Sequence, residues 1–187
     1  MIKTFVFMGR PGSGKGKQSK LLAEKLKCKL FSTGARVREV AQENSSLGHK
    51  IKEIHDSGDL TPSWFVSFLF EEAYLALDNN EAIIFDGLGR KEPEARLFAE
   101  ISDWLDRDFR VIYLDVSEQS VIKRLNKRRV IEGRADDSNI QNRFDNFNAQ
   151  TIPSLNFFRS INKVIDINGG PLPDAVFAEL WQKVSAL

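Results

Sequence analysis

The stretch GRPGSGKGKQ, from Gly9 to Gln18, limits what this chain can fold into more than any other part of its sequence. Glycines at positions 9 and 14, followed by Lys15, match the G-x-x-x-x-G-K part of the phosphate-binding loop pattern. An apolar run, Ile2 to Met8, leads into the stretch, and a helical pattern, Lys15 to Leu26, leads out of it. In this context backbone N–H groups, the positive end of the helix and the lysine ammonium all attract phosphate. The stretch therefore favours a nucleotide-phosphate site over an ordinary glycine-rich turn between a strand and a helix.

The composition and length of the chain exclude several other classes of protein. A length of 187 residues fits one domain with a sizeable core, and a net charge of +1 gives no general argument for a nucleic acid or a membrane as partner. The single cysteine, Cys28, excludes an internal disulfide and a multi-cysteine metal site, and we expect it to be a small buried hydrophobe. The apolar N-terminal run is too short for a signal peptide and no stretch has the length of a membrane span, which favours a cytoplasmic protein.

Short apolar runs alternate with helical patterns along the whole chain. We expect buried strands at 2–8, 29–31, 82–85, 110–115 and 163–167. Helices are expected at 15–26, 35–44, 63–77, 93–105, 118–129, 140–150 and 174–185. This order predicts an α/β fold with a doubly wound parallel sheet, whose ligands bind at the carboxyl ends of the strands.

Two groups of side chains suit chemistry but are better explained by structure. An aromatic-rich segment at 63–77 has near-helical spacing, so we expect core packing rather than a stacking platform from Trp64, Phe65, Phe68, Leu69 and Phe70. His49 and His55 have no nearby Cys or Asp at metal-ligand spacing, so both are expected on the surface.

A second candidate site is the segment FSTGARVR at 31–38, where a strand end turns into a helix. Ser32 or Thr33 can cap that helix, which is a purely structural explanation. Alternatively, the N-terminus of the helix and Arg38 face a second ligand that carries phosphate. The segment alone does not separate these two interpretations.

A third candidate is the segment IIFDGLGR at 83–90, a buried strand that ends in Asp86. It resembles a Walker B element, whose aspartate holds magnesium directly or through water. Because Gly16 stands where Ser or Thr would ligate magnesium in the phosphate loop, we expect phosphates and waters to bind the ion, with Asp86 acting through water. Arg90 has the geometry to bridge phosphates, whereas the alternative is a strand followed by a tight glycine turn.

A fourth candidate is the basic segment KRLNKRR at 123–129, followed by GRADD at 133–137 and Arg143. Basic runs often form a solvated helix face or bind RNA, but Arg124 and Arg128 lie at i, i+4 and share one face. Phosphoryl transfer needs positive charge around the migrating group, and arginines on a mobile lid supply it and exclude water. Asp136 and Asp137 are expected to anchor these arginines rather than to act as bases.

These four features, in this order and spacing, resemble the adenylate kinases and the wider nucleoside-monophosphate kinases. The match runs end to end through the loop at 9–18, S-T-G-x-x-x-R at 32–38, Leu47-Gly48, Gly58-Asp59-Leu60, D-G-x-x-R at 86–90, and R-x-x-x-R with G-R-x-D-D at 124–137. Lysine followed by glycine is itself discriminating, because most other phosphate-loop kinases have Ser or Thr there.

The resemblance implies a P-loop kinase fold, with a five-stranded parallel sheet flanked by helices in a single domain over 1–187. It implies a monophosphate-binding insertion at about 32–62 and a short lid at about 129–137, without the cysteines of zinc-bearing lids. It also implies a monomer that closes around its substrates and a magnesium-dependent transfer of the γ-phosphoryl of ATP to a nucleoside monophosphate, with AMP favoured.

The resemblance further implies roles for particular residues. ATP would be bound by Gly12, Ser13, Gly14, Lys15, Gly16, Lys17, Arg124, Gly169 and Gly170. The monophosphate would be bound by Thr33, Arg38, Asp59, Leu60, Thr61, Gly87, Leu88, Gly89, Arg90, Glu94, Arg134 and Arg143. The catalytic set would be Lys15, Arg90, Arg128, Arg134 and Arg143, with Mg²⁺ as cofactor near Asp86.

Three residues depart from the pattern of the family. Lys17 stands where Thr is usual, Gly89 stands where D-G-F-P-R kinases have proline, and Glu94 stands where adenylate kinases usually have a glutamine that reads the AMP base. An amide both donates and accepts, as the adenine edge requires, whereas an ionised carboxylate only accepts and suits the two donors of guanine. Thr33 argues for the adenylate kinase branch. We therefore expect Glu94 to weaken or broaden monophosphate selectivity.

Two alternatives to an adenylate kinase stay open at this point. One is a kinase of the same fold with another or broader acceptor, such as GMP, CMP or UMP. The other is a catalytically weak nucleotide-binding module, associated with RNA through the basic segment. Retention of Lys15, Asp86, Arg90, Arg134 and Arg143 speaks against the second alternative.

Overall fold

Five short strands form one parallel sheet in the order β2-β3-β1-β4-β5. Their bounds are β1 Thr4–Gly9, β2 Lys29–Ser32, β3 Ile83–Asp86, β4 Phe109–Asp115 and β5 Val164–Asn168. The computed structural model describes residues 2–78, 80–132 and 139–187, and within them the side chains of all but 127–132. The five predicted strands and their parallel arrangement are confirmed, with ends that shift by one or two residues.

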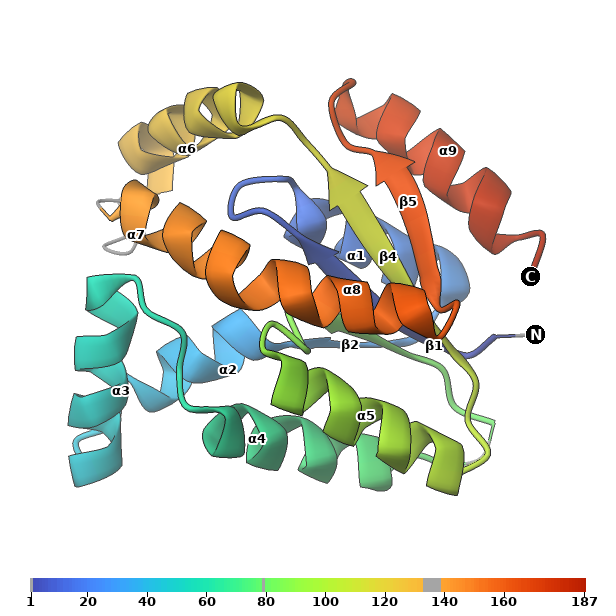
Figure 1. Ribbon diagram of the computed structural model, residues 1–187, viewed down its shortest axis with the longest axis horizontal. Helices are drawn as coiled ribbons and strands as arrows, with labels where there is room; N and C mark the ends of the chain where they lie inside the picture. The colour runs from blue at the N-terminus through green and yellow to red at the C-terminus, as the bar shows by residue number, and fades with distance from the viewer. Residues whose placement is uncertain (1, 79, 133–138) are drawn as a thin grey trace.

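Helices cover both faces of this sheet (Figure 1). Helices α1 and α9 pack on one face, and α4, α5 and α8 pack on the other. The helical bounds are α1 Lys15–Leu26, α2 Thr33–Val40, α3 Ser46–Ser57, α4 Ser63–Leu75, α5 Glu92–Trp104, α6 Glu118–Glu132, α7 Ile140–Asn146, η2 Phe147–Thr151, α8 Ile152–Ser160 and α9 Pro173–Val184. Helices α7, the π-helix η2 and α8 follow one another as a single rod across the front of the sheet in Figure 1.

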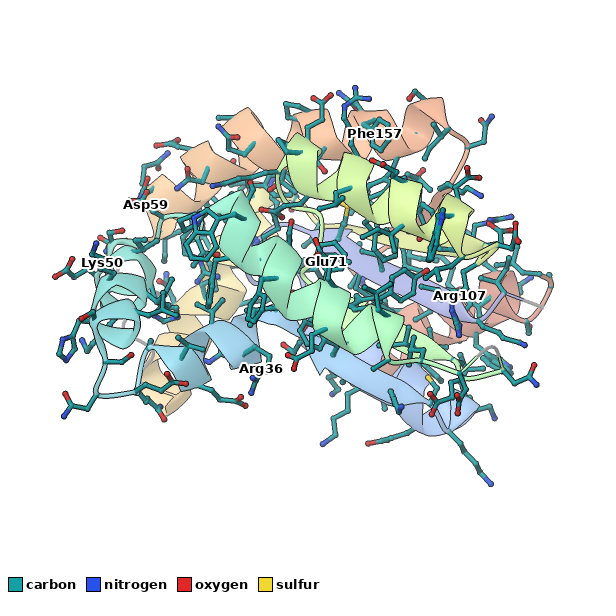
Figure 2. The ribbon with its side chains drawn as sticks, turned by 90° about the horizontal axis from the view of Figure 1, so that it is seen from below. Arg36, Lys50, Asp59, Glu71, Arg107 and Phe157 are labelled. Carbon is teal, nitrogen blue, oxygen red and sulfur yellow. The ribbon has the colours of Figure 1, made fainter. Side chains whose placement is uncertain are left out.

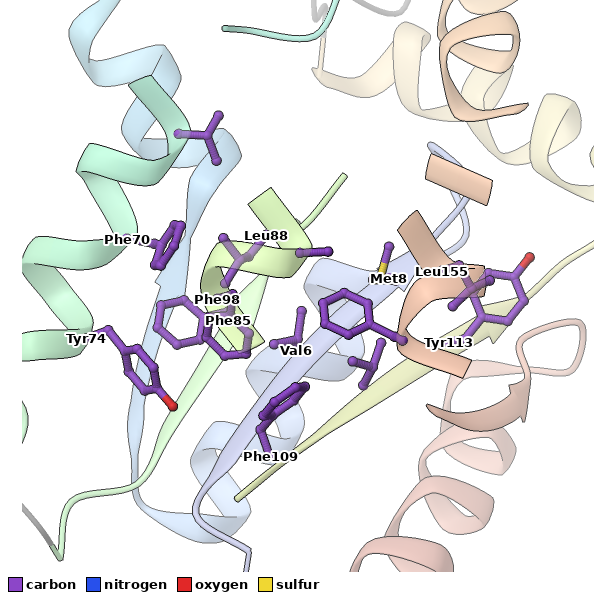
Figure 3. Packing of buried hydrophobic residues seen from close by; sticks show 14 of the residues in the cluster. Val6, Met8, Phe70, Tyr74, Phe85, Leu88, Phe98, Phe109, Tyr113 and Leu155 are labelled. Carbon is purple, nitrogen blue, oxygen red and sulfur yellow. The ribbon is translucent and has the colours of Figure 1, made fainter. Parts of the chain in front are cut away.

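The central strand β1 is buried on both faces because its side chains alternate between two cores. Val6 and Met8 belong to the cluster that contains the aromatic side chains of α4 and α5, which Figure 3 shows in close packing. Phe5 and Phe7 belong to the cluster on the other face, with residues of α1 and α9. A strand that is apolar at every position is therefore what this place in the sheet requires. The same burial anchors the loop that follows β1.

Several sequence expectations need correction. The helix expected at 35–44 spans Thr33–Val40, and the one expected at 140–150 gives way to the π-helix η2 after Asn146. Helices α3 and α8 were not expected. Phe65, Leu69 and Phe70 are core residues as expected, but Trp64 and Phe68 are 64% and 60% exposed, because they lie on the opposite side of α4.

Two further side chains differ from expectation. His49 is exposed as expected, whereas only 19% of the His55 side chain is exposed, because it lies against Asp56 at the end of α3. Cys28 is half-buried and packs against the core of α1 and α9. Burial raises the pKa of its thiol, which agrees with a packing role. Over the described parts of the chain, we find no helix with the length and apolar character to cross a bilayer.

Candidate active site

The phosphate loop lies between the end of β1 at Gly9 and the start of α1 at Lys15. Gly14 caps α1 with φ +98°, and a Cβ built on it would meet nothing within 4 Å, so the space above the helix end is open. The backbone N–H groups of Lys17 and Gln18 donate to the Gly14 carbonyl. The N–H groups of the preceding residues have no acceptor one turn earlier, which leaves the start of α1 as an anion-binding end.

Lys15 bends back over its own loop. Its Nζ donates to the carbonyl oxygens of Gly9 at 2.7 Å and Arg10 at 2.9 Å. These are neutral acceptors, so an anionic phosphate is a stronger partner for the ammonium. The lysine is therefore held at the mouth of the loop and is available to exchange those carbonyls for phosphate oxygens.

Asp86, at the end of β3, lies directly beside the start of α1. A Cβ built on Gly16 would come within 3.3 Å of Asp86 Oδ2, which is tighter than ordinary contact. The missing side chain at position 16 therefore lets the carboxylate approach the phosphate loop. Among the described residues no group of three or more His, Cys, Asp or Glu gathers in a way that could hold a metal by itself. A cation here would take most of its ligands from phosphates and water.

One large cavity of ≈ 570 Å³ connects the phosphate loop with residues from five other parts of the chain. Of the predicted residues, it is lined by Gly12, Gly14, Lys15, Gly16, Lys17, Thr33, Arg38, Asp59, Leu60, Thr61, Asp86, Gly87, Arg90, Glu94, Arg124 and Arg143. A second cavity of ≈ 40 Å³ adjoins it and shares Lys15, Arg90 and Arg143, with Leu88 in its wall. Ser13, Gly89, Gly169 and Gly170 line neither cavity.

The start of α2 separates the two interpretations of the segment at 31–38. Ser32 Oγ accepts the N–H of Ala35 at 3.4 Å and so caps the helix. Thr33 is 5% exposed, and its Oγ1 is buried with no hydrogen-bond partner in the structure described. An unpaired buried hydroxyl costs about 1–3 kcal/mol. The capping role thus belongs to Ser32, whereas the hydroxyl of Thr33, a residue of the cavity wall, is left without a partner in the structure described.

Three arginines from different elements line the cavity around that hydroxyl. Arg38 comes from α2, Arg90 from the connection after β3, and Arg143 from α7. Gly87 leaves room for one of them, because a Cβ there would lie 2.7 Å from a terminal nitrogen of Arg90. The Arg90 guanidinium forms no hydrogen bond or ion pair with the residues that the structure describes. The cavity thus adds three arginines to the positive charge of the phosphate loop, which favours a second anionic ligand.

Glu94 lines the cavity but is also part of the scaffold. Its Oε2 accepts the backbone N–H of Arg90 at 3.0 Å and of Lys91 at 3.4 Å, which caps the start of α5. The side chain is 2% exposed, and burial raises the pKa of its carboxyl although Arg90 and Lys91 act in the other direction. Oε2 therefore accepts backbone N–H groups, whereas Oε1 remains available to a ligand in the cavity.

Gly89 has a backbone conformation that explains its departure from the family pattern. Its φ of +68° is out of reach for proline, whose ring fixes φ near −65°. Its carbonyl accepts a hydrogen bond from the buried hydroxyl of Ser154 on α8, and a Cβ would meet the ring of Phe158 at 3.1 Å. The residue supports the wall of the cavity from behind.

Arg124, on α6, connects the phosphate loop to the loop that follows β5. One terminal nitrogen donates to the Gly169 and Gly170 carbonyls at 2.9 and 3.0 Å, and the other donates to the Ser13 carbonyl at 3.1 Å. The predicted glycines at 169 and 170 are therefore close to Arg124 rather than in the cavity wall. Of the remaining predicted residues, Arg134, Asp136 and Asp137 lie outside the described residues, as does the side chain of Arg128.

The cavity also contains residues that were not predicted. They are Lys20, His55, Gly58 and Asn146, with apolar side chains from β2, α2, α4 and α6. Lys20 lies one turn after Lys17 on α1, a spacing that is readable in the sequence. His55 and Asn146 carry no such signal, because they reach the cavity through contacts between distant segments.

Comparison with known proteins identifies the family of the chain. The family model described as adenylate kinase matches residues 7–163. An adenylate kinase of Leptospira biflexa serovar Patoc is 33% identical over 171 residues, which cover 90% of this chain and 92% of that protein. Adenylate kinase 1 of Nostoc sp. is 34% identical over 178 residues, with 94% and 95% coverage, and the adenylate kinase of Thermus thermophilus is 29% identical over 178 residues, with 94% and 93% coverage. The resemblance drawn from the motifs is confirmed, and the chain belongs to the adenylate kinase family.

Proposed function

We propose that this protein is an adenylate kinase, which transfers the γ-phosphoryl of ATP to AMP in a reversible reaction that gives two ADP. The observation that carries the proposal is a single cavity with two phosphate-binding sets in its wall, the loop with Lys15 on one side and three arginines with the unpaired Thr33 hydroxyl on the other. Two phosphate-binding sets in one cavity fit a reaction in which one nucleotide passes a phosphoryl group to another.

On the donor side, the residues from Gly12 to Lys17 bind the phosphates of ATP. The N–H groups at the start of α1 and the Lys15 ammonium hold the β- and γ-phosphates, and Lys15 leaves the carbonyls of Gly9 and Arg10 as it does so. The side chain of Lys17 is exposed in the cavity, and its ammonium forms no hydrogen bond or ion pair within the described part of the chain, so its charge is available to the nucleotide. Arg124 fixes the loops around the base.

On the acceptor side, Arg38, Arg90 and Arg143 neutralise the phosphate of AMP and the charge on the migrating phosphoryl group. The Thr33 hydroxyl gains a partner when the monophosphate enters, so binding recovers the cost of its burial. The acceptor oxygen is already anionic, so no general base is required and the transfer is direct, without a covalent enzyme intermediate. In the proposal, residues 32–62 form the monophosphate-binding insertion, and 129–137, which carries Arg134 next to Arg128, forms the lid.

Magnesium is the implied cofactor, and the residues present fit it. Asp86 offers one carboxylate beside the start of α1, next to a glycine with no competing side chain. This donor set suits a cation that keeps several waters and takes its other ligands from substrate phosphates. When bound, the ion supplies positive charge to the β- and γ-phosphates, and Asp86 would hold its waters.

The proposal takes one chain as the functional unit. A coupled assay of ADP formation from ATP and AMP tests the proposed function directly. Turnover that requires both nucleotides and magnesium is expected. Binding of ATP without ADP formation would leave a nucleotide-binding module and overturn the proposal.

A second acceptor is favoured by one observation, the carboxylate of Glu94 in place of the usual amide. Since Oε2 already accepts two backbone N–H groups, the ionised side chain offers one uncommitted oxygen and no donor to a base. A panel of AMP, GMP, CMP and UMP measures the resulting selectivity. Strict AMP preference that is unchanged in Glu94→Gln would exclude a broader acceptor range.

A further inference from the structure

Three asparagines form a stripe along α7, on the side that faces the end of α3. Asn139 precedes the helix, Asn142 lies in its first turn and Asn146 is its last residue. Their spacing of three and four residues places the side chains on one face of the helix. Figure 2 labels Asp59 where this helix lies beside the end of α3. None of the three residues belongs to the phosphate-binding sets described above.

The stripe holds the turn that connects α3 to α4. Asn139 Nδ2 donates to the Asp56 carbonyl at 2.8 Å. Asn142 Nδ2 donates to the Ser57 carbonyl and to Asp59 Oδ1, each at 2.9 Å. Asn146 Nδ2 lies 3.2 Å from Asp59 Oδ1 and 3.2 Å from Asn142 Oδ1. The contacts join residues 83 to 87 positions apart, so they are tertiary bonds between two separate parts of the fold.

Lys91 holds the next two residues of the same connection from the other side. Its Nζ donates to the Thr61 carbonyl at 2.9 Å and lies 3.4 Å from the Leu60 carbonyl. A carbonyl or side chain of every residue from 56 to 61 is thus held by side chains of Asn139, α7 or Lys91, with Asn146 Nδ2 lying 3.5 Å from the Gly58 carbonyl. Asp59, Leu60 and Thr61 line the large cavity, so this clamp fixes one wall of the acceptor side.

Gly58 lets α7 approach closely enough for these bonds. It ends α3 with φ +79°, and a Cβ there would lie 3.1 Å from Asn139 Cβ and 3.3 Å from Arg143 Cγ. Arg143 therefore lies between the asparagines and the connection, on the same short helix. The bonds that fix the connection also fix its distance from the Arg143 side chain.

We propose that Asn139, Asn142 and Asn146 are positioning residues that hold the monophosphate arm, α2 and α3, against α7. The proposal rests on the function proposed above, since it concerns the acceptor side of that site. If binding of the monophosphate requires the held arrangement, then the measured affinity falls in proportion to the fraction of molecules in which the arm is held. Asn139 and Asn142 do not line the cavity, so loss of their amides lowers that fraction without removing a side chain from the cavity wall itself.

Uncharged amides suit such a role in a solvent-exposed position. Hydrogen bonds to backbone carbonyls lose little strength in salt, whereas exposed ion pairs are screened. The Asp59 carboxylate adds charge-assisted bonds, and the amide N–H of Asn142, with Ser57 and Asn146, lowers the pKa of that carboxyl. The pKa of Asp59 therefore reports whether the arm is held.

The test compares the double variant Asn139→Ala/Asn142→Ala, whose two residues do not line the cavity, with a control variant, Gln141→Ala. Gln141 lies on the same helix, but its amide bonds to Asp145 within that helix. We expect the double variant to bind AMP about tenfold more weakly by calorimetry, because each neutral hydrogen bond contributes roughly two- to tenfold. ATP binding should stay within about twofold, amide exchange should increase over 33–58 alone, and the pKa of Asp59 should rise towards its ordinary value. The control should match the wild type in all four measurements.

A second variant guards against simple loss of structure. Asn142→Asp places a second carboxylate beside Asp59, which should weaken AMP binding further at low salt and recover part of it at high salt. Unchanged AMP affinity in the double variant, or equal loss of ATP and AMP affinity, would overturn the proposal. These readouts need no turnover, so absence of ADP formation in the wild type would refute the proposed function separately.

Discussion

The donor side and the acceptor side of the cavity are built in different ways. The donor side is one continuous stretch, Gly9 to Lys17, whose ligand groups are mainly backbone N–H groups at a helix start. The acceptor side collects side chains from α2, from the connection after α3, from the segment after β3 and from α7. A local sequence pattern is enough to form the first, whereas the second exists only when distant segments are held together. Substitutions on the donor side should therefore affect binding only by removing a contact to the nucleotide. Substitutions on the acceptor side should also affect binding by displacing the segments that carry its side chains.

The largest effect is expected from removing one cation on each side. Lys15→Met and Arg90→Ala should each lower kcat by about a hundredfold or more, as the loss of one preorganised electrostatic contact does. If the two sides are separate, the KM for ATP should rise mainly in the first variant and the KM for AMP mainly in the second. Steady-state kinetics with each substrate varied in turn measures this. Lys25→Met, on the outside of α1, is the control, and near wild-type kcat in both variants would rule out the mechanism.

An intermediate effect is expected on the KM for AMP, which should depend on pH through the protonation of Glu94. Burial raises the pKa of its carboxyl against the opposing charges of Arg90 and Lys91, so the neutral form persists to higher pH than usual. The neutral form donates and accepts, as adenine requires, and the ionised form only accepts. The KM for AMP should therefore increase as pH rises through the raised pKa, by up to about tenfold. Glu94→Gln should keep only the pH dependence that comes from ionisation of AMP, so parallel profiles of the two proteins would contradict this expectation.

The smallest effect is expected from Lys17, the least usual residue of the loop. Its ammonium is exposed in the cavity, where a single charge contact contributes a few tenths to 1 kcal/mol. Lys17→Thr should raise the KM for ATP about threefold at low salt, and the difference should vanish at high salt. The KM for AMP should not change. A lower KM for ATP in the variant would mean that the Thr hydroxyl usual in the family is worth more than the added charge.

The same contrast explains how much the sequence could predict. The helix at Lys15–Leu26 was predicted to the residue, because the glycines before it and the apolar strand behind it are local signals. Helix α3 was missed since its apolar side is narrow, and its ends depend on the Ser45 cap and on Gly58. Helix α8 was missed, since the helix expected at 140–150 stopped before it, although Pro153 fits the first turn of a new helix.

For the site, sequence motifs indicated which residue types gather but not how each is used. Ser32 and Thr33 looked equivalent as caps, and only the structure separates the capping hydroxyl from the unpaired one. Glu94 looked like a free reader of the base, yet it also caps α5. The spacing of the three asparagines is visible in the sequence. Their partners lie 83 or more residues away, so no local pattern predicts them.

The π-helix η2 has a consequence for how this protein tolerates changes of length. Upstream of it, Asn142 and Arg143 face the acceptor side, and downstream of it Ser154 supports Gly89 and Phe158 enters the core. Within it, the Phe147 ring lies 5.0 Å from the Arg10 guanidinium of the phosphate loop. Because an α-helix turns by about 100° per residue, deleting one residue from η2 would rotate everything downstream by that angle relative to α7. After a one-residue deletion here, the side chains before η2 and those after it could not both reach their present partners. The same deletion in a surface loop would change the structure only locally.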